Sequence, residues 1–456
     1  MSKNKGQVLM TEGAPLPIII RFSIPLILTA FFQQLYSFID SMIVGRCISA
    51  EALAAVNLTS SLNFVIMGLT MGSSLGFCVP FAQAVGAREK DMTSRYFWNG
   101  LYLAAGLSLL GSFLAVPNTY NLLTLIKTPD NLIDMSAEYL SVILIGLLIT
   151  TMYHFMAGIM RALGDSTHPF YFMLAGNVIN ILLDLLFIMV LDMGVYGAAV
   201  ATIISQLFSV ILCVYHLFAK MGAIEAKGED GANYRSFHGF CMKRLITIGL
   251  PMGLELSVNG IGSVILQSCV NQLGSVVVTA VAAGEKIRSM ITLPLENLGS
   301  AMSTYTAQNY GAKNKSRIYM GIKSSLLILV IYCAAAWALV FVLKKPLVYL
   351  LLGTTESENA QATVTYLAMI STMFFFHGAL QIFRNILQGM GHSVSAILSG
   401  VFEIIGRLIG GSLAVYFISF KIVCFANPMA WGLAAAYCLI MTLVYLNRLH
   451  WNKAEK

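Results

Sequence analysis

The stretch AQAVGAREK (Ala82–Lys90) returns as AQNYGAKNK 225 residues later, identical at five of nine positions. Two other features recur at almost the same distance. Pro25, early in the first apolar run, returns as Pro251, and LGDS (Leu163–Ser166) returns as MGHS 227 residues later. Three nearly constant offsets in separate parts of the chain are hard to obtain by chance. The sequence therefore predicts an internal duplication, with one copy of the same fold in each half.

Each half is too apolar for a water-soluble domain. Of the 456 residues, 57% are hydrophobic and only 11% are charged, whereas about a quarter of the residues in soluble proteins are charged. A helix of roughly 20 apolar residues can cross a bilayer because it pairs its own backbone amides. Twelve apolar runs lie at 17–44, 53–81, 96–117, 137–159, 168–190, 196–219, 245–271, 277–306, 319–342, 362–388, 395–419 and 427–447. The predicted fold class is an all-α polytopic membrane protein with twelve transmembrane helices.

The duplication also predicts how these helices are grouped. Six spans is an even number, so the second half enters the membrane in the same orientation as the first. This gives two parallel six-helix lobes around a central cavity. The longest polar insertion lies near the middle of the chain. We therefore expect an N-terminal lobe over 1–219, a cytoplasmic linker over 220–244 and a C-terminal lobe over 245–456.

The basic residues predict which way the helices face. Eighteen of the 28 Lys and Arg residues fall on the side of the two termini, and only five fall on the other side. Because positive charge is retained on the cytoplasmic side, both termini are expected in the cytoplasm and the chain in the cell membrane. The same loops explain the net charge of +7, so no nucleic-acid partner is expected. No cleavage-site pattern precedes the first run, which is expected to remain as a span.

Polar residues inside the first span point to a function. Ionisable residues within spans are rare and by default indicate a functional site. Gln33, Ser37 and Asp40 are spaced i, i+4 and i+7, with Tyr36 four residues before Asp40, so they follow one helix face. Asp40 lies about four residues before the end of the span, and solvation at the membrane surface is the competing interpretation.

The fifth and sixth spans carry a similar set of residues. Asn177, Asn180 and Asp184 are spaced i, i+3 and i+7 on the fifth span, and the sixth adds Thr202 and Gln206. Two carboxyl groups among amides and hydroxyls form a site for a proton or another cation, since a buried carboxyl beside a second one takes up a proton more readily. The structural alternative is that each aspartate only bonds a neighbouring helix or caps a loop.

Charged residues in the second half have less definite roles. Glu255, four residues after Pro251, is the counterpart of the first-half acids, and a structural and a functional role are equally open for it. Glu403 and Arg407 are spaced i, i+4, which favours an ion pair on one helix. The segment EKIR (285–288) interrupts the eighth span and indicates either a similar pair or a broken helix.

Familiar catalytic and cofactor motifs are absent from the sequence. There is no GxxxxGK[ST] loop for ATP and no HExxH zinc helix, and the eight cysteines are scattered without the close spacing of a metal site. His154 and His377 are lone histidines in apolar runs and are expected to be satisfied core residues. We therefore expect no enzymatic activity, no catalytic residues and no cofactor.

The chain resembles the MATE (multidrug and toxic compound extrusion) family over nearly its whole length. The matching stretches are PLILTAFFQQLYSFIDSMIVGR from Pro25, AQAVGA, RALGDSTHP from Arg161, GNVINILLDLLF followed by GVYGAAVAT, GLPMGLELS and AQNYGAKNK. The resemblance implies two six-helix lobes, a V-shaped central cavity, and efflux of cationic or amphipathic drugs driven by a proton or sodium gradient.

The resemblance also assigns candidate residues. The first-span aspartate of the family falls on Asp40, and its cluster in the fifth and sixth spans falls on Asn180, Asp184 and Thr202. These residues are expected to bind the coupling H⁺ or, as the alternative, Na⁺; neither carboxylate has an obvious basic partner in the same half, which favours H⁺. The residues expected to line the substrate cavity are Gln33, Gln34, Tyr36, Ser37, Asn177, Gln206 and Glu255.

Departures from the family pattern separate its branches. The NorM-like branch has an acid in the seventh span where this chain has Asn259 and Gly260, and another in the tenth span, whereas Tyr366–Gln388 contains none. The first-lobe site, as in the DinF-like branch, is the better match. Two alternatives stay open: a lipid-linked precursor or polysaccharide flippase of the same superfamily, which usually needs basic residues for phosphate, and a multispanning membrane enzyme. The chain is expected to act as a monomer in the lipid bilayer.

Overall fold

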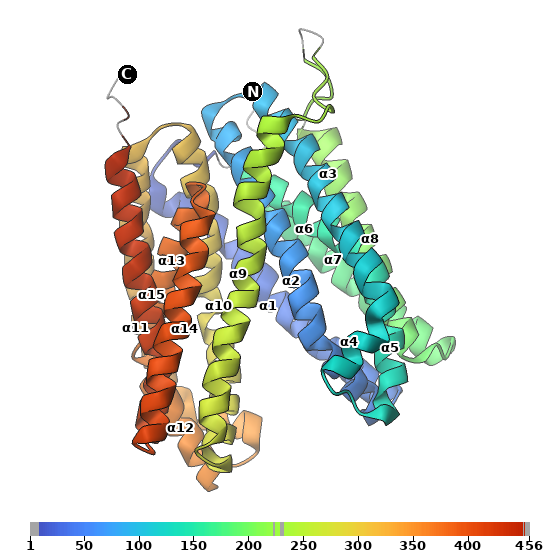
Figure 1. The fold of residues 1–456 in the computed structure, drawn as a ribbon, viewed down its shortest axis with the longest axis vertical. Helices are drawn as coiled ribbons and strands as arrows, with labels where there is room; N and C mark the ends of the chain where they lie inside the picture. Colours follow the sequence, from blue (N-terminus) through green and yellow to red (C-terminus); the bar gives the residue numbers. More distant parts are fainter. Residues whose placement is uncertain (1–8, 222–223, 229–231, 450, 452–456) are drawn as a thin grey trace. The chain divides into compact units, whose positions relative to one another are not determined.

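The computed structural model describes residues 9–221, 224–228, 232–449 and 451. Helices joined by short turns make up nearly all of this part of the chain (Figure 1), and its one isolated β-bridge joins Lys227 and Asn233. The elements are α1 (Pro15–Cys47), α2 (Ala50–Ala87), α3 (Lys90–Ala115), η1 (Val116–Asn118), α4 (Thr119–Leu125), α5 (Asp130–Ile145), α6 (Leu147–Ala162), α7 (Thr167–Asp184), η2 (Leu185–Val190), α8 (Gly194–Tyr215), η3 (His216–Met221), α9 (Gly239–Asn271), α10 (Ser275–Gly311), α11 (Lys315–Leu352), α12 (Glu358–Ser371), α13 (Phe374–Gly389), α14 (Ser393–Tyr416) and α15 (Phe420–Arg448).

The chain divides into two compact units. The first comprises Met1–Leu9 and Ile24–Leu256, and the second comprises Met10–Ser23 and Ser257–Lys456. The divisions fall inside α1 and α9, so each of these two helices contributes to both units. Helices α2–α8 belong entirely to the first unit and α10–α15 entirely to the second.

The repeated loops fold into the same backbone turns. After α2, Arg88 has a φ of 60°, and after α10 the matching Lys313 has a φ of 53°. In both turns this residue donates its backbone N–H to the carbonyl three residues earlier. The residue after it donates its N–H to the carbonyl five residues earlier, which belongs to Ala84 in the first turn and to Asn309 in the second. This left-handed turn satisfies the last carbonyls of the helix. Equivalent sequences thus end equivalent helices in the same way.

A second pair of turns repeats as well. Gly164 and Gly391, 227 residues apart, have φ values of 89° and 87°, a region in which glycine avoids the strain of a side chain. The helices before each turn are bent alike, by 47° between α5 and α6 and by 51° between α12 and α13. The internal duplication predicted from the sequence is therefore present in the backbone.

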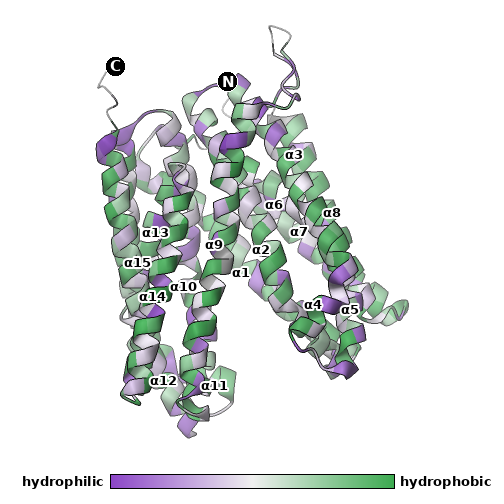
Figure 2. Ribbon diagram, in the orientation of Figure 1, coloured by the Kyte–Doolittle hydropathy of each residue, from purple (hydrophilic) through white to green (hydrophobic). Residues whose placement is uncertain are grey.

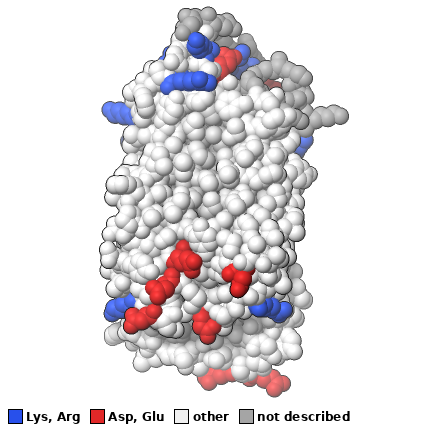
Figure 3. All heavy atoms as spheres, turned by 90° about the vertical axis from the view of Figure 1, so that its right-hand side faces the viewer, with Lys and Arg blue, Asp and Glu red and all other residues white. Residues whose placement is uncertain are grey.

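Most of these helices are long and apolar enough to cross a membrane. In the described part of the chain, nine single helices meet this condition, and the bent pairs α5–α6 and α12–α13 raise the number to eleven. Hydrophobic residues dominate the helices (Figure 2), and on the face drawn in Figure 3 charged residues gather near the two ends, with an uncharged band between them. Phe113, Val342 and Leu350 are 75%, 72% and 85% exposed, as expected for side chains that face lipid.

Helix α10 accounts for the twelfth predicted span. It runs unbroken for 37 residues from Ser275 to Gly311, although it contains Glu285 and Arg288. The two side chains form an ion pair with an N–O distance of 2.7 Å on one face of the helix, so their charges do not interrupt it. The alternative of a broken eighth span is therefore wrong, and the expected ion pair is present.

Candidate functional site

Two aspartates from different helices meet inside the first unit. Asp40 lies near the end of α1, and Asp184 is the last residue of α7. Their carboxyl groups lie close enough to interact directly; Asp184 is fully buried and Asp40 is half-buried. Ionised carboxylates only accept hydrogen bonds and repel each other, so a proton between the two groups would stabilise this contact. Asp40 is therefore part of a buried pair and not merely a solvated residue at a helix end.

Asn180 links three helices around this acidic pair. It lies one turn before Asp184 and is 1% exposed. Its amide nitrogen, when turned toward the carboxyl groups, donates to Asp184 Oδ2 at 2.7 Å and to the Tyr36 hydroxyl at 2.8 Å, while its oxygen accepts the backbone N–H of Thr202 at 3.0 Å. The Thr202 hydroxyl donates to the Ala198 carbonyl at 3.0 Å. One buried amide thus connects α1, α7 and α8.

Apolar side chains pack directly beyond the polar groups. The buried members of this cluster are Val44, Ala52, Ile188, Val195 and Ala198. Val44 follows Asp40 by one turn on α1, and Ala198 precedes Thr202 by one turn on α8. The cluster therefore lies within one helical turn of the site on both α1 and α8. Directly after Asp184 the chain continues as the π-helical segment η2, an irregularity that is frequent at functional sites.

Tyr139 on α5 is a member of the site that sequence reasoning missed. It packs against the apolar cluster, and it lies close enough to Asp40 and Asp184 to interact electrostatically with both. Ser136 lies three residues before Tyr139, but no carboxyl group lies three or four residues from it on its own helix, so no sequence pattern linked it to the acidic pair. Only the packing of α5 against α8 brings it to the acidic pair.

The acidic pair has no basic partner among the described residues. Neither Asp40 nor Asp184 forms an ion pair with Lys or Arg there, and the Oδ1 atom of each has no hydrogen-bond partner in that part of the chain. A buried charged acceptor without a partner is costly, at about 1–3 kcal/mol or more. The site is therefore built to take up positive charge.

The other predicted residues differ in their contacts and exposure. Gln206 accepts a hydrogen bond from the Thr150 hydroxyl on α6. Asn177 is half-buried, and its Nδ2 has no hydrogen-bond partner among the described residues. Glu255 on α9 is 7% exposed. The three polar residues Gln33, Gln34 and Ser37 are exposed along α1. The structure thus brings together Tyr36, Asp40, Asn180, Asp184 and Thr202.

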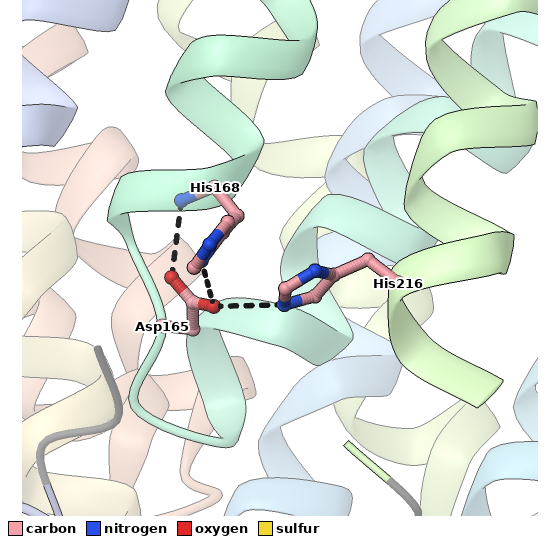
Figure 4. Close-up of side chains that lie close together, drawn as sticks. All are labelled: Asp165, His168 and His216. Atoms are coloured by element: carbon pink, nitrogen blue, oxygen red, sulfur yellow. Dashed lines mark hydrogen bonds and ion pairs between the residues drawn. The ribbon is translucent and has the colours of Figure 1, made fainter. Parts of the chain in front are cut away.

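A second titratable cluster, also missed by sequence reasoning, lies at the start of α7. Asp165 Oδ1 accepts the backbone N–H groups of Thr167 and His168, both at 3.1 Å, and so caps the helix. Its Oδ2 lies 2.6 Å from His168 Nδ1 and 3.4 Å from His216 Nε2 (Figure 4). These three groups could hold a metal ion by their geometry. Their mutual contacts already satisfy the buried carboxylate, however, so we assign the cluster to fastening the α6–α7 turn to the end of α8.

Comparison with known proteins agrees with this architecture. A family model described as MatE matches residues 25–186 and 251–411. The chain is 29% identical over 397 residues, with 85% of each chain covered, to "Probable multidrug resistance protein YpnP" of Bacillus subtilis (strain 168). It is 23% identical to "Probable multidrug resistance protein NorM" of Thermotoga maritima, with 83% of this chain and 81% of the relative covered.

The fold also matches solved structures. A multidrug resistance MATE family transporter of the MOP superfamily, in an outward-facing conformation, superposes with a TM-score of 0.89 at 22% identity, over 99% of this chain and 100% of that one. This likeness confirms the predicted fold of twelve helices in two lobes. Because the MatE model covers both halves of the chain and more than half of its residues, the protein belongs to the MatE family, whose members are transporters and not enzymes.

Proposed function

We propose that this protein is a secondary active transporter that exports cationic or amphipathic organic compounds in exchange for H⁺, with Na⁺ as the alternative. The observation that carries the proposal is the buried Asp40–Asp184 pair, which has no basic partner among the described residues. Family membership supports transport, and the names of the relatives support drugs as substrates.

Proton occupancy would control the contact between α1 and α7. With one shared proton, the two carboxyl groups hydrogen-bond and hold the helices together. Without it, two negative charges at this distance repel each other in a low-dielectric surrounding. A proton that enters from outside would therefore favour one arrangement of α1, and its release to the cytoplasm would favour another. A bound ligand shifts the equilibrium between these two arrangements of α1 only by the difference in its binding free energy for them.

The orientation of Asn180 favours H⁺ over Na⁺. Sodium is a hard cation that needs several oxygen ligands, and the carboxylates of Asp40 and Asp184 provide some of them. Asn180, however, makes more hydrogen bonds when its nitrogen faces Asp184 and its oxygen accepts the Thr202 amide. In this orientation its oxygen is not available to Na⁺.

The arrangement of the lobes, the linker and the termini follows from the distribution of basic residues and from the internal duplication. We propose lobes over 1–219 and 245–456 as the two repeats of the transporter, with the linker and both termini in the cytoplasm on the basic side of a multi-pass cell-membrane protein. A monomer contains both lobes and is sufficient for this cycle.

Transport in proteoliposomes tests the proposal. Wild-type protein, Asp40→Asn and Asp184→Asn are compared for export of a lipophilic cation under an imposed pH or sodium gradient. Asp192→Asn is the matched control, because Asp192 is exposed and has a left-handed φ of 51° that asparagine also tolerates. We expect gradient-driven export by the wild type and the control only. Wild-type export by both site variants would remove the acidic pair from coupling.

A further inference from the structure

The glutamine of the repeated loop holds the start of a helix in both halves of the chain. It is Gln83 in the first copy and Gln308 in the second, and both side chains are buried, at 4% and 0% exposure. Gln83 accepts a hydrogen bond from Arg244 near the start of α9, and Gln308 accepts the backbone N–H of Met10, just before α1, at 2.9 Å. Helices α1 and α9 are the two that contribute to both units. The repeated motif thus fixes the starts of the two shared helices.

In the second unit, one arginine binds the chain that leads into α1. Arg317, in the first turn of α11, donates from Nη2 to the carbonyls of Met10 and Glu12, at 2.9 and 3.1 Å. Its Nη1 donates to the carbonyl of Gly13 at 2.8 Å. A guanidinium group carries several N–H donors in one fixed plane, and hydrogen bonds from a charged donor are stronger than those between neutral groups. A single side chain therefore fixes the backbone of Met10–Gly13.

The side chain of Arg317 is itself held by buried neighbours. Its Nε donates to Asn309 Oδ1 at 3.0 Å, and the Asn309 amide nitrogen donates to the Met10 carbonyl at 3.1 Å. The backbone carbonyl of Arg317 accepts the Tyr305 hydroxyl at 2.8 Å, and Asn314 Oδ1 accepts its backbone N–H at 3.1 Å. Met10, Asn309 and Tyr305 are fully buried. The groups that bind the segment before α1 are thus fixed in position.

The first unit holds the start of α9 with the same three types of side chain. Arg244 donates from Nη2 to Gln83 and from Nη1 to the Tyr96 hydroxyl, the latter at 3.3 Å. The buried Asn99 accepts the backbone N–H of His238 at 3.0 Å, directly before α9. Here the arginine belongs to the helix that is held, whereas in the second unit it belongs to the helix that holds. In both units a glutamine, an asparagine and an arginine anchor a shared helix.

We propose that Arg317 is a positioning residue for transport, because it anchors the start of α1 to the second unit while the other end of α1 carries Asp40 in the first. This role rests on the proposed coupling by the Asp40–Asp184 pair. Proton uptake changes the interaction at that end of α1, and a rigid helix can carry such a change along its length. A loose start would take up the movement, whereas an anchored start passes it to the second unit. Arg317 therefore acts without contacting the proton or the substrate.

Hydrogen exchange followed by mass spectrometry tests the anchor. Wild-type protein, Arg317→Met and Lys323→Met are compared at full length in phosphatidylcholine nanodiscs. Lys323 is the matched control, because it is exposed on the same helix and its replacement removes the same charge. We expect amides between Met10 and Ile19 to exchange at least about tenfold faster in Arg317→Met, the effect of one charge-assisted hydrogen bond. Unchanged exchange of this segment in Arg317→Met would overturn the proposal.

Binding and transport together separate a positioning role from general damage. Equilibrium binding of a lipophilic cation and its gradient-driven export are measured for the same three proteins. We expect Arg317→Met to keep the affinity of the wild type but to export at least about tenfold more slowly, and Lys323→Met to keep both. Export at the wild-type rate would show that α1 needs no anchor. Loss of affinity to the same extent as export would show a merely structural role, and either result overturns the proposal.

A conservative variant keeps the test valid if Arg317→Met does not fold. Arg317→Lys retains the positive charge but replaces the planar group by a single ammonium group, which cannot reproduce the arrangement of donors toward the three carbonyls. We expect it to show the same two effects in smaller degree, and wild-type exchange and export would overturn the anchor. Hydrogen exchange needs neither gradient nor substrate, so its failure would leave proton coupling by the acidic pair untouched.

Discussion

Asp40 on α1 and Asp184 on α7 bring their carboxyl groups into direct interaction, in a part of the fold where neither has a basic partner among the described residues. Two ionised carboxylates would repel each other there, whereas a proton between them would turn the contact into a hydrogen bond. The stability of this unit and the occupancy of its proposed coupling site therefore depend on the same proton.

Replacement of one acid by its amide should make the pair independent of that proton. In Asp40→Asn the amide donates to Asp184 directly, so we expect a melting temperature that changes less between mildly acidic and alkaline buffer than that of the wild type. The wild type should lose stability as the pH rises, because its folded state holds a proton that the unfolded chain releases. Detergent-solubilised protein followed by thermal denaturation gives the comparison. Parallel pH profiles of the two proteins would contradict the shared proton.

Asn180→Ala should lower the stability of the protein more than Asn177→Ala, because the Asn180 amide joins three helices. Asn180→Ala leaves Asp184 Oδ2, the Tyr36 hydroxyl and the Thr202 amide without a partner, at a cost of about 1–3 kcal/mol for each group that water cannot reach. Asn177→Ala, on the same helix, removes an amide whose Nδ2 has no partner among the described residues. We expect a clear fall in melting temperature only for Asn180→Ala. Equal effects of the two variants would show that Asn180 has no special role.

The Asp165 cluster should behave as a helix cap and not as a metal site. Asp165→Ala removes the acceptor for two backbone N–H groups at the start of α7, and we expect a loss of about 1–2 kcal/mol of stability. His168→Ala should cost less, because its side chain is 36% exposed. Differential scanning calorimetry of the wild type with and without a chelator completes the experiment. A melting temperature that falls on chelation would favour a bound metal.

Close packing of α14 and α15 predicts which glycines tolerate a methyl group. A Cβ at Gly406 would lie 2.4 Å from Ala430 Cα, and one at Gly410 would lie 2.8 Å from Ala426 Cα. This is the spacing at which small residues let two membrane helices approach each other. We expect Gly406→Ala to destabilise the second unit by about 1–3 kcal/mol. Gly106→Ala on α3, where no atom lies within 4 Å of the added carbon, should be neutral or stabilising. Unfolding in detergent measures both; equal stability would argue against the close approach.

Local pattern in the sequence was enough to predict the fold. Each apolar run lies on a helix or a bent helix pair, because a segment in lipid must pair its own backbone groups whatever its neighbours are. The repeated loops predicted the duplication. The conformation of a short turn is determined by the residues within it, so the repeated sequences form the same left-handed turn at Arg88 and at Lys313. Helical spacing also selected Asp40, Asn180 and Asp184, since residues on one face of one helix can be identified without knowledge of its partners.

Tertiary structure decided everything that depends on contacts between helices. The interaction between Asp40 and Asp184, the approach of Tyr139 to both and the Asp165–His216 contact each join residues far apart in the chain. In the second half, sequence spacing predicted the Glu403–Arg407 pair, but only packing added Arg384 to it. The sequence thus determined the helices and the polar face of each one. Which faces meet was set by side-chain packing between helices, and so was the charge of each buried site, because burial and the neighbouring groups decide what a cavity can bind.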